Sequence, residues 1–155
     1  MTIRSLAIMG AVLAGTVISN ESLATNRNSS TVPPLFAVLL GGNEVSPTGE
    51  ADAGDKDGRG SATVIIDGPK LCFGIVVEDI DTPILAHIHR GVAGVNGPIV
   101  VDLVPPEAGD PGASSGCVSV SDKELLGEIQ NRPVGFYVNV HTERFPAGAV
   151  RGQPF

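Results

Sequence analysis

Residues 61–80 read SATVIIDGPKLCFGIVVEDI, and this stretch decides the fold class. Its first part, Ser61 to Ile66, is rich in β-branched residues, which favour strands. Its second part, Leu71 to Ile80, places apolar side chains at alternate positions, as a strand with one buried face does. Asp67-Gly68-Pro69 lies between the two parts and is a turn sequence. The stretch therefore predicts a β-hairpin.

Short apolar segments of the same kind flank the hairpin, separated by Gly, Pro or Asp clusters; they are residues 35–40, 84–89, 99–104, 136–142 and 149–153. One helix is predicted near residues 122–131, because Ser121 and Glu124 have capping-box spacing and Pro133 stops the helical pattern. The Pro- and Gly-rich residues 105–116 are expected to form an irregular loop. About seven short strands at hairpin spacing predict an all-β fold, an antiparallel β-sandwich or barrel of Greek-key-like type.

Length and composition bound the class of protein. The chain has 155 residues, enough for one domain, and 42% of them are hydrophobic, so it can bury a core. Its formal net charge is -7, which repels phosphate and anionic headgroups. We therefore expect neither nucleic acid nor an anionic membrane surface as the main partner.

The N-terminus has the pattern of a secretory signal peptide. Arg4 precedes an uncharged apolar run from Leu6 to Ile18, and the small-residue site Ser22-Leu23-Ala24 follows. The run is too short to span a bilayer, which needs about 20 helical residues. We expect a signal peptide over residues 1–24, a flexible lead-in over 25–34 and one domain over 35–155. The mature protein would then have no membrane span and would be secreted, to the extracellular space or the periplasm.

The chain has two cysteines, Cys72 and Cys117. An even number of cysteines in a secreted protein favours a disulfide. We expect the two to be joined.

The three histidines have a spacing that suits a metal ion. His87 and His89 are two residues apart, so on a strand they point to the same side, away from the apolar Ala86 and Ile88. The same alternation puts His141 on the face away from the core, together with Tyr137 and Asn139. Three imidazoles from two neighbouring strands would suit copper or zinc. Tyr137 and Asn139 would then be candidates for hydrogen bonds to the ligands. The alternative is that the histidines are polar residues on the outer face, capped by the loop over residues 91–98.

The sequence gives little indication of a calcium site, a nucleophilic hydrolase or a phosphate-binding site. The acidic run Asp55 to Gly58 resembles part of an EF-hand loop, but Val64 stands where the bidentate glutamate is needed. The sequence has no nucleophile elbow, and no phosphate-binding glycine loop opens a helix. We single out no catalytic residue.

Four groups of motifs resemble the CHRD domain, the module repeated in the developmental antagonist chordin and found alone in secreted bacterial proteins. They are Phe36-Ala37 with Leu40-Gly-Gly-Asn-Glu-Val45, Ala86-His-Ile-His-Arg-Gly91, Gly94-Val-Asn-Gly-Pro-Ile-Val-Val101, and Tyr137-Val-Asn-Val-His-Thr142 with Pro146-Ala-Gly-Ala-Val-Arg-Gly-Gln153. The resemblance runs from Phe36 to about Gln153 and implies a secreted, β-rich, single-domain protein.

A second likeness is to the copper/zinc superoxide dismutases, which carry an H-x-H pair on an outer strand face. It implies His87, His89 and His141 as copper ligands. Because the chain has only three histidines, a bridging histidine and a full zinc site cannot be added. The resemblance to the CHRD domain implies instead a non-catalytic extracellular binding module for a protein or small ligand. The alternative is a metal-binding protein, for copper or zinc, or a superoxide-dismutase-like oxidoreductase using the three histidines.

Overall fold

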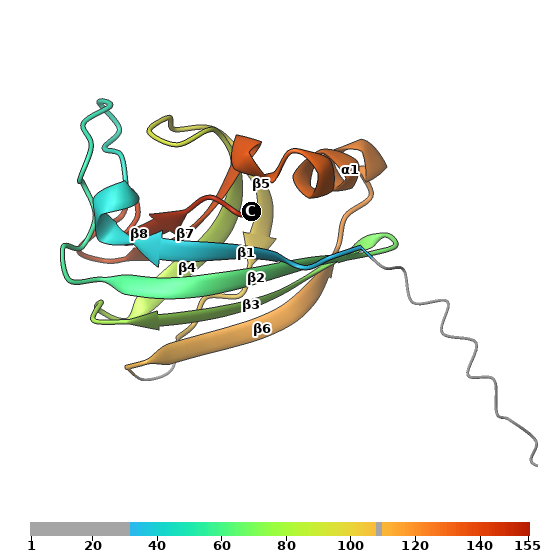
Figure 1. Cartoon of the computed structure of the whole chain (residues 1–155). Helices are drawn as coiled ribbons and strands as arrows, with labels where there is room; N and C mark the ends of the chain where they lie inside the picture. The colour runs from blue at the N-terminus through green and yellow to red at the C-terminus, as the bar shows by residue number, and fades with distance from the viewer. Residues whose placement is uncertain (1–31, 108–109) are drawn as a thin grey trace, which may run out of the picture.

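The computed structural model describes residues 32–107 and 110–155, which form one antiparallel sheet curled into a nearly closed barrel (Figure 1). The predicted signal peptide and most of the lead-in lie outside the described residues. The strands are β1 (Leu35–Leu40), β2 (Arg59–Asp67), β3 (Lys70–Glu78), β4 (Pro83–Arg90), β5 (Ile99–Leu103), β6 (Gly112–Ser119), β7 (Phe136–Thr142) and β8 (Val150–Gly152). Their order across the sheet is β5-β4-β7-β8-β1-β2-β3-β6. The predicted all-β sandwich or barrel with one short helix is confirmed.

The predicted hairpin is β2 and β3, which are paired along their whole length. Gly68 in the turn has a φ of +57°, a left-handed conformation that glycine adopts without steric cost. The alternating residues of β3 that the sequence marked as apolar, Leu71, Phe73, Ile75 and Val77, are all buried in the barrel core.

The core fills the barrel with apolar side chains from seven of the eight strands and from the helix. Strands β4 and β7 both contribute alternate residues, such as Ala86 and Ile88 on β4 and Val138 and Val140 on β7. Their remaining side chains therefore point to the outside of the barrel.

The helix α1 (Lys123–Asn131) lies at one end of the barrel, where Leu125, Leu126 and Ile129 are buried (Figure 1). The predicted cap at Ser121 is wrong by one residue. Asp122 is the N-cap, and its side chain accepts a hydrogen bond of 2.9 Å from the Leu125 backbone N–H. Among residues 32–107 and 110–155, no helix is long and apolar enough to cross a membrane.

Strand β6 corrects the prediction that residues 105–116 are entirely irregular, because it begins at Gly112. Its glycines, serines and alanine have a weak preference for strands, so the sequence pattern does not show it. Long-range pairing with β3 decides its structure, and within that pairing Cys72 and Cys117 are direct neighbours joined by a disulfide. The predicted disulfide is confirmed.

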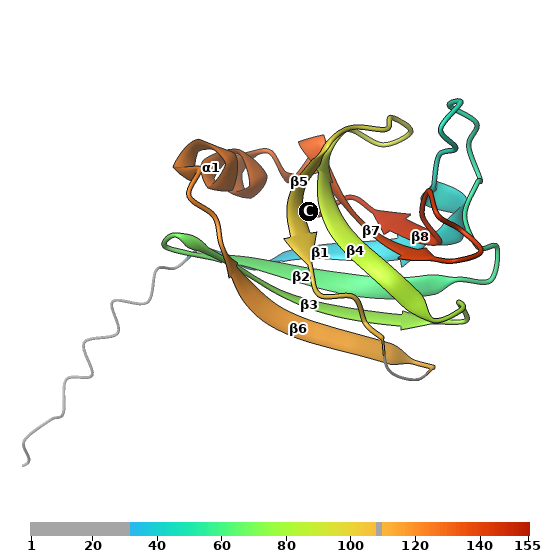
Figure 2. The same cartoon turned by 180° about the vertical axis from the view of Figure 1, so that it is seen from behind.

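The barrel stays open between its two edge strands. Strands β5 and β6 lie at the two ends of the strand order and are not paired with each other (Figure 2). A side-chain hydrogen bond of 2.8 Å links these edges, from Ser114 Oγ on β6 to the carbonyl of Val104, directly after β5. Strand β6 is therefore held to the sheet mainly by its pairing with β3 and by the disulfide.

We predict that replacing both cysteines, Cys72→Ser with Cys117→Ser, lowers the free energy of unfolding by up to about 4 kcal/mol. The bond closes a loop of 45 residues and so reduces the entropy of the unfolded chain. Urea unfolding of the oxidised protein and of the double variant measures the difference, with Ser115→Ala on the same strand as the control. Equal unfolding midpoints for the oxidised protein and the double variant would show that the bond has no stabilising role.

Candidate metal centre

The three histidines of the chain come together on the outside of the barrel, where β4 and β7 are paired. His87 and His89 lie on β4, and His141 lies on β7. In the register of the two strands His87 is opposite Asn139, and His89 is opposite Tyr137. The side chains are on the face that strand alternation predicts. They are nevertheless buried, with exposed fractions of 6%, 9% and 7%, because loops cover this part of the outer face.

The imidazole rings are in contact with one another. His87 Nδ1 lies 3.0 Å from His141 Nε2. One ligand nitrogen from each of the three histidines lies within 4.8 Å of those of the other two. Three nitrogens bound to one zinc or copper ion at about 2.0 Å would lie about 3.4 Å apart. The His87–His141 pair, at 3.0 Å, is close to this spacing.

Two of the rings are oriented by backbone carbonyl groups. His89 Nδ1 lies 2.8 Å from the Gly97 carbonyl oxygen, and His141 Nδ1 lies 3.0 Å from that of Pro146. A carbonyl oxygen only accepts hydrogen bonds, so each Nδ1 carries the proton. Nε2 of both rings therefore has its lone pair free to accept a hydrogen bond or bind a metal.

The histidines are poor bases in this environment. Burial, with the neighbouring His141 and His89 as a smaller cause, lowers the pKa of His87 to about 4. Burial also lowers the pKa values of His89 and His141. All three rings are therefore neutral near pH 7, which is the protonation state that binds a metal.

Tyr137 and Asn139, the residues expected to lie beside the three histidines, are both buried. Together with the histidines they form an outer layer between β4 and β7 on one side and the covering loops on the other. The Tyr137 ring is stacked on His89, with centroids 4.7 Å apart and an interplanar angle of 8°. Its hydroxyl accepts a hydrogen bond of 3.3 Å from the Gly97 N–H. Asn139 lies beside His89 and the Glu44 carboxylate. Tyr137 thus packs against the His89 ring, and Asn139 lies next to both that imidazole and a buried acid.

Arg151 is the largest fully buried side chain of the described residues. Its Cζ lies 3.4 Å from the centroid of the Tyr137 ring, a cation–π contact. Its Nη2 donates to the carbonyls of Val92 at 3.0 Å and Val95 at 2.8 Å. Its Nη1 lies 3.8 Å from Glu44 Oε1, so the guanidinium has one nearby negative charge.

Asn96 connects the two loops that cover the histidines on the outer face of β4 and β7. Its amide nitrogen donates to the carbonyls of Val45 at 3.2 Å and Ser46 at 2.7 Å, and its oxygen accepts a hydrogen bond from Arg151 at 3.3 Å. The loop over residues 91–98 and the loop after η1 (Gly41–Asn43) are therefore tied together above β4 and β7 (Figure 1). Gly97, whose carbonyl orients His89, is held in place by this network.

Sequence reasoning missed Glu44, Asn96 and Arg151. All three lie within the motifs that resemble the CHRD domain, but a charged or amide residue within a few positions of glycines normally indicates a solvated turn. One pattern in the sequence could have indicated where Arg151 lies, namely strand alternation. Arg151 directly follows the apolar Val150 in a short strand, so its side chain points to the opposite face from that of Val150. The histidines have the same relation to Ala86 and Ile88.

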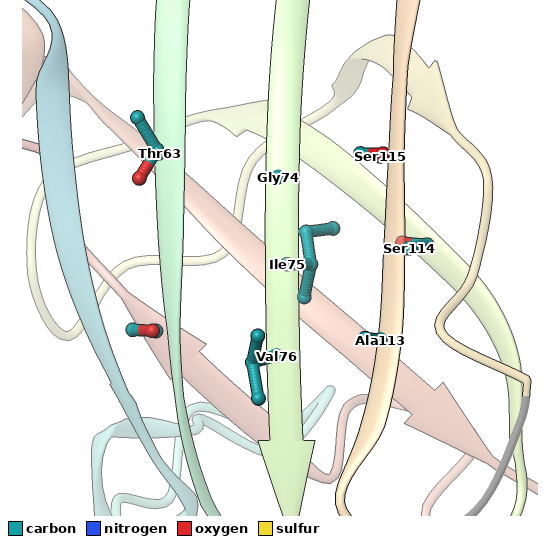
Figure 3. Close-up of a pocket in the computed structure, with 8 residues that line it drawn as sticks. Thr63, Gly74, Ile75, Val76, Ala113, Ser114 and Ser115 are labelled. Atoms are coloured by element: carbon teal, nitrogen blue, oxygen red, sulfur yellow. The ribbon is translucent and has the colours of Figure 1, made fainter.

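A shallow depression on another part of the barrel has no comparable chemistry (Figure 3). It lies over β2, β3 and β6, and its lining includes Thr63, Gly74, Val76 and Ser115. None of its lining residues is titratable or a typical metal ligand. The histidine cluster is therefore the stronger candidate site.

We predict that the metal-free protein loses stability as the pH falls from about 6.5 towards 4. The unfolded chain binds protons on its histidines below about 6.5, whereas His87 in the folded chain stays neutral down to about 4. Urea unfolding at pH 7.5 and pH 5.0, with a chelator present, measures the loss. Burial raises the pKa of Glu44, which acts in the opposite direction, so His87→Gln is the control that isolates the histidine. The same pH dependence in both proteins would contradict the prediction.

We also predict that Arg151→Met lowers the free energy of unfolding by about 3 to 5 kcal/mol, because it leaves buried acceptors and Glu44 without their cationic partner. Arg132→Met, at an exposed arginine, is the matched control and should change it by no more than about 0.5 kcal/mol. Urea unfolding of both variants tests the difference. A similar small effect in both would show that the buried guanidinium is not needed for stability.

Comparison with known protein families gives one match, to the CHRD domain, over residues 35–153. The searches of curated proteins and of solved structures gave no significant match. The match covers every strand of the barrel and the whole histidine layer. The chain belongs to the CHRD domain family.

Proposed function

We propose that this protein is an extracellular binding module that holds a single copper or zinc ion on His87, His89 and His141. The observation that carries the proposal is the arrangement of three buried, neutral imidazoles whose ligand nitrogens lie within 4.8 Å of one another. Metal-binding histidines normally donate their other ring N–H to a carbonyl or carboxylate oxygen, which fixes the ring. His89 and His141 do so here, on the Gly97 and Pro146 carbonyls.

The donor set selects the kind of metal. Three imidazoles suit copper and zinc, whereas calcium and magnesium prefer oxygen ligands. Three ligands leave a coordination position for water or a small ligand. The proposal uses the same three histidines, on the same two strands, as the copper or zinc site suggested by the sequence alone.

We propose binding rather than catalysis. The three histidines of the chain are all used in one site, so none is left to bridge to a second metal as in a two-metal dismutase centre. An oxidoreductase activity is the alternative, and it would need a redox-active ion such as copper at this single site.

The proposed location is outside the cell, or in the periplasm. Family membership and the Cys72–Cys117 disulfide are consistent with it, since disulfides persist in oxidising compartments. The proposal takes residues 1–24 as a signal peptide, 25–34 as a lead-in and 35–155 as the domain. With a net charge of -7, a protein or small ligand is a better partner than nucleic acid.

Calorimetric titration of the metal-free protein with Cu(II) and with Zn(II) tests the metal site. We expect one equivalent to bind. His89→Gln and His141→Gln should each weaken binding by at least about 100-fold, more than the loss of an outer hydrogen-bond partner normally costs. Glutamine keeps a polar side chain of similar length, and circular dichroism verifies that each variant is folded.

Asp57→Asn, in the acidic loop before β2, is the control for unspecific binding and should leave the affinity unchanged. The proposal fails if no equivalent binds, or if the histidine variants bind as tightly as the native protein. Affinity lost equally in Asp57→Asn would place the ion in the acidic loop instead.

A further inference from the structure

We propose that His87 binds the metal through Nδ1 and that Asp102 is the positioning residue that accepts a hydrogen bond from its Nε2–H in the metal-bound protein. The inference rests on the proposed function, because it specifies how the same three histidines hold the ion. It also assigns a role to an exposed carboxylate that the sequence motifs did not single out.

The first step is the position of the proton on His87. His141 Nδ1 carries a proton, because it faces the Pro146 carbonyl oxygen at 3.0 Å. Its Nε2 is therefore the acceptor in the contact with His87 Nδ1 at 3.0 Å. His87 Nδ1 must then donate. Its Nε2 makes no hydrogen bond to the Asp102 carboxylate beside it, at 3.7 Å, so the structure places the proton of the ring on Nδ1 in the metal-free protein.

The second step is the direction of the lone pairs. Nε2 of His141 points at Nδ1 of His87, and a metal between these two rings replaces the proton that they share. His87 would then bind through Nδ1, whereas His89 and His141 bind through Nε2. Binding through Nε2 of His87 would instead put the ion on the side of that ring away from its contact with His141.

The third step concerns what lies at the far edge of the His87 ring. Asp102 on β5 is the cross-strand neighbour of His87, and its Oδ1 lies 3.7 Å from His87 Nε2. This distance is too long for a hydrogen bond, as expected when both atoms are acceptors. The Asp102 side chain is 87% exposed, so it can rotate towards Nε2 without a packing cost.

Metal loading therefore changes the tautomer of His87. The Nδ1 proton leaves to solvent as the metal–nitrogen bond forms, and Nε2 takes a proton from solvent, so the ring stays neutral. Nε2–H then donates to the Asp102 carboxylate. All three ligand rings would have one nitrogen on the ion and the other on an oxygen, contributed by Gly97, Pro146 and Asp102.

Long-range ¹H–¹⁵N NMR of the histidine rings reads the tautomers directly. In the metal-free protein we expect His87 to carry its proton on Nδ1. After one equivalent of Zn(II) we expect Nε2–H on His87, with His89 and His141 keeping Nδ1–H. A zinc-loaded protein in which His87 retains Nδ1–H would overturn the inference.

Affinity for Zn(II) tests the role of Asp102. We expect Asp102→Ala to weaken binding by about 10- to 100-fold, the usual effect of losing an outer partner of a metal ligand. Asp102→Asn keeps an acceptor oxygen without the charge and should weaken binding less, and Asp102→Glu should restore most of it. Asp67→Ala, which removes an equal charge at the exposed β2–β3 turn, should change the affinity less than about twofold.

The outcomes separate the two proposals. If His89→Gln and His141→Gln weaken Zn(II) binding while Asp102→Ala behaves like Asp67→Ala, the metal site stands and the role of Asp102 is refuted. If none of these variants weakens binding, the three-histidine site itself is refuted, and the inference with it.

Discussion

The outer layer of this protein depends on a single buried cation, the guanidinium of Arg151. Removing such a charge from water costs several kcal/mol unless it is paired and hydrogen-bonded. The chain offsets this cost with the carbonyls of Val92 and Val95, the face of Tyr137 and the carboxylate of Glu44. These groups come from three separate parts of the sequence. The hydrogen bonds and charge contacts of the Arg151 guanidinium therefore fix two loops over β4 and β7. They create a second buried region, which is polar and lies outside the barrel core.

Close backbone approach makes this interior possible. Gly148 has a φ of +141°, and a Cβ there would lie 2.0 Å from Glu44 Oε2. A Cβ at Gly97 would lie 1.6 Å from the Arg90 carbonyl oxygen. Any other residue at either position would push a loop away from the layer beneath it. Gly148 and Gly97 are thus explained by the space that Glu44 and the loop over residues 91–98 require.

The same two loops determine the protonation state and the tautomer of the histidines. Alternation along β4 and β7 gives the apolar residues to the core and the histidines to the outer face. If that face were solvated, the imidazoles would be ordinary bases with pKa values near 6.5. Beneath the loops, burial lowers their pKa values and keeps them neutral. Carbonyl oxygens of the loops then select the tautomer in which Nε2 of His89 and His141 is free.

Several features could be predicted from the sequence because they depend on neighbouring residues. The β2–β3 hairpin follows from β-branched runs around a turn, and the faces of β4 and β7 follow from a period of two. The disulfide follows from the number of cysteines and the predicted compartment. Strand β6 was missed because its small residues have little intrinsic preference and its pairing with β3 is long-range.

The sequence by itself determined which residues face outward, and the tertiary structure alone decided that this outward face is buried. Alternation is a local property of an extended backbone, so His87, His89 and His141 could be placed on one side without knowing the fold. Burial depends on loops brought together from distant parts of the chain. The links that hold those loops, Asn96 to Ser46 and Arg151 to Val95, join residues 50 and 56 positions apart, and no local pattern records such contacts.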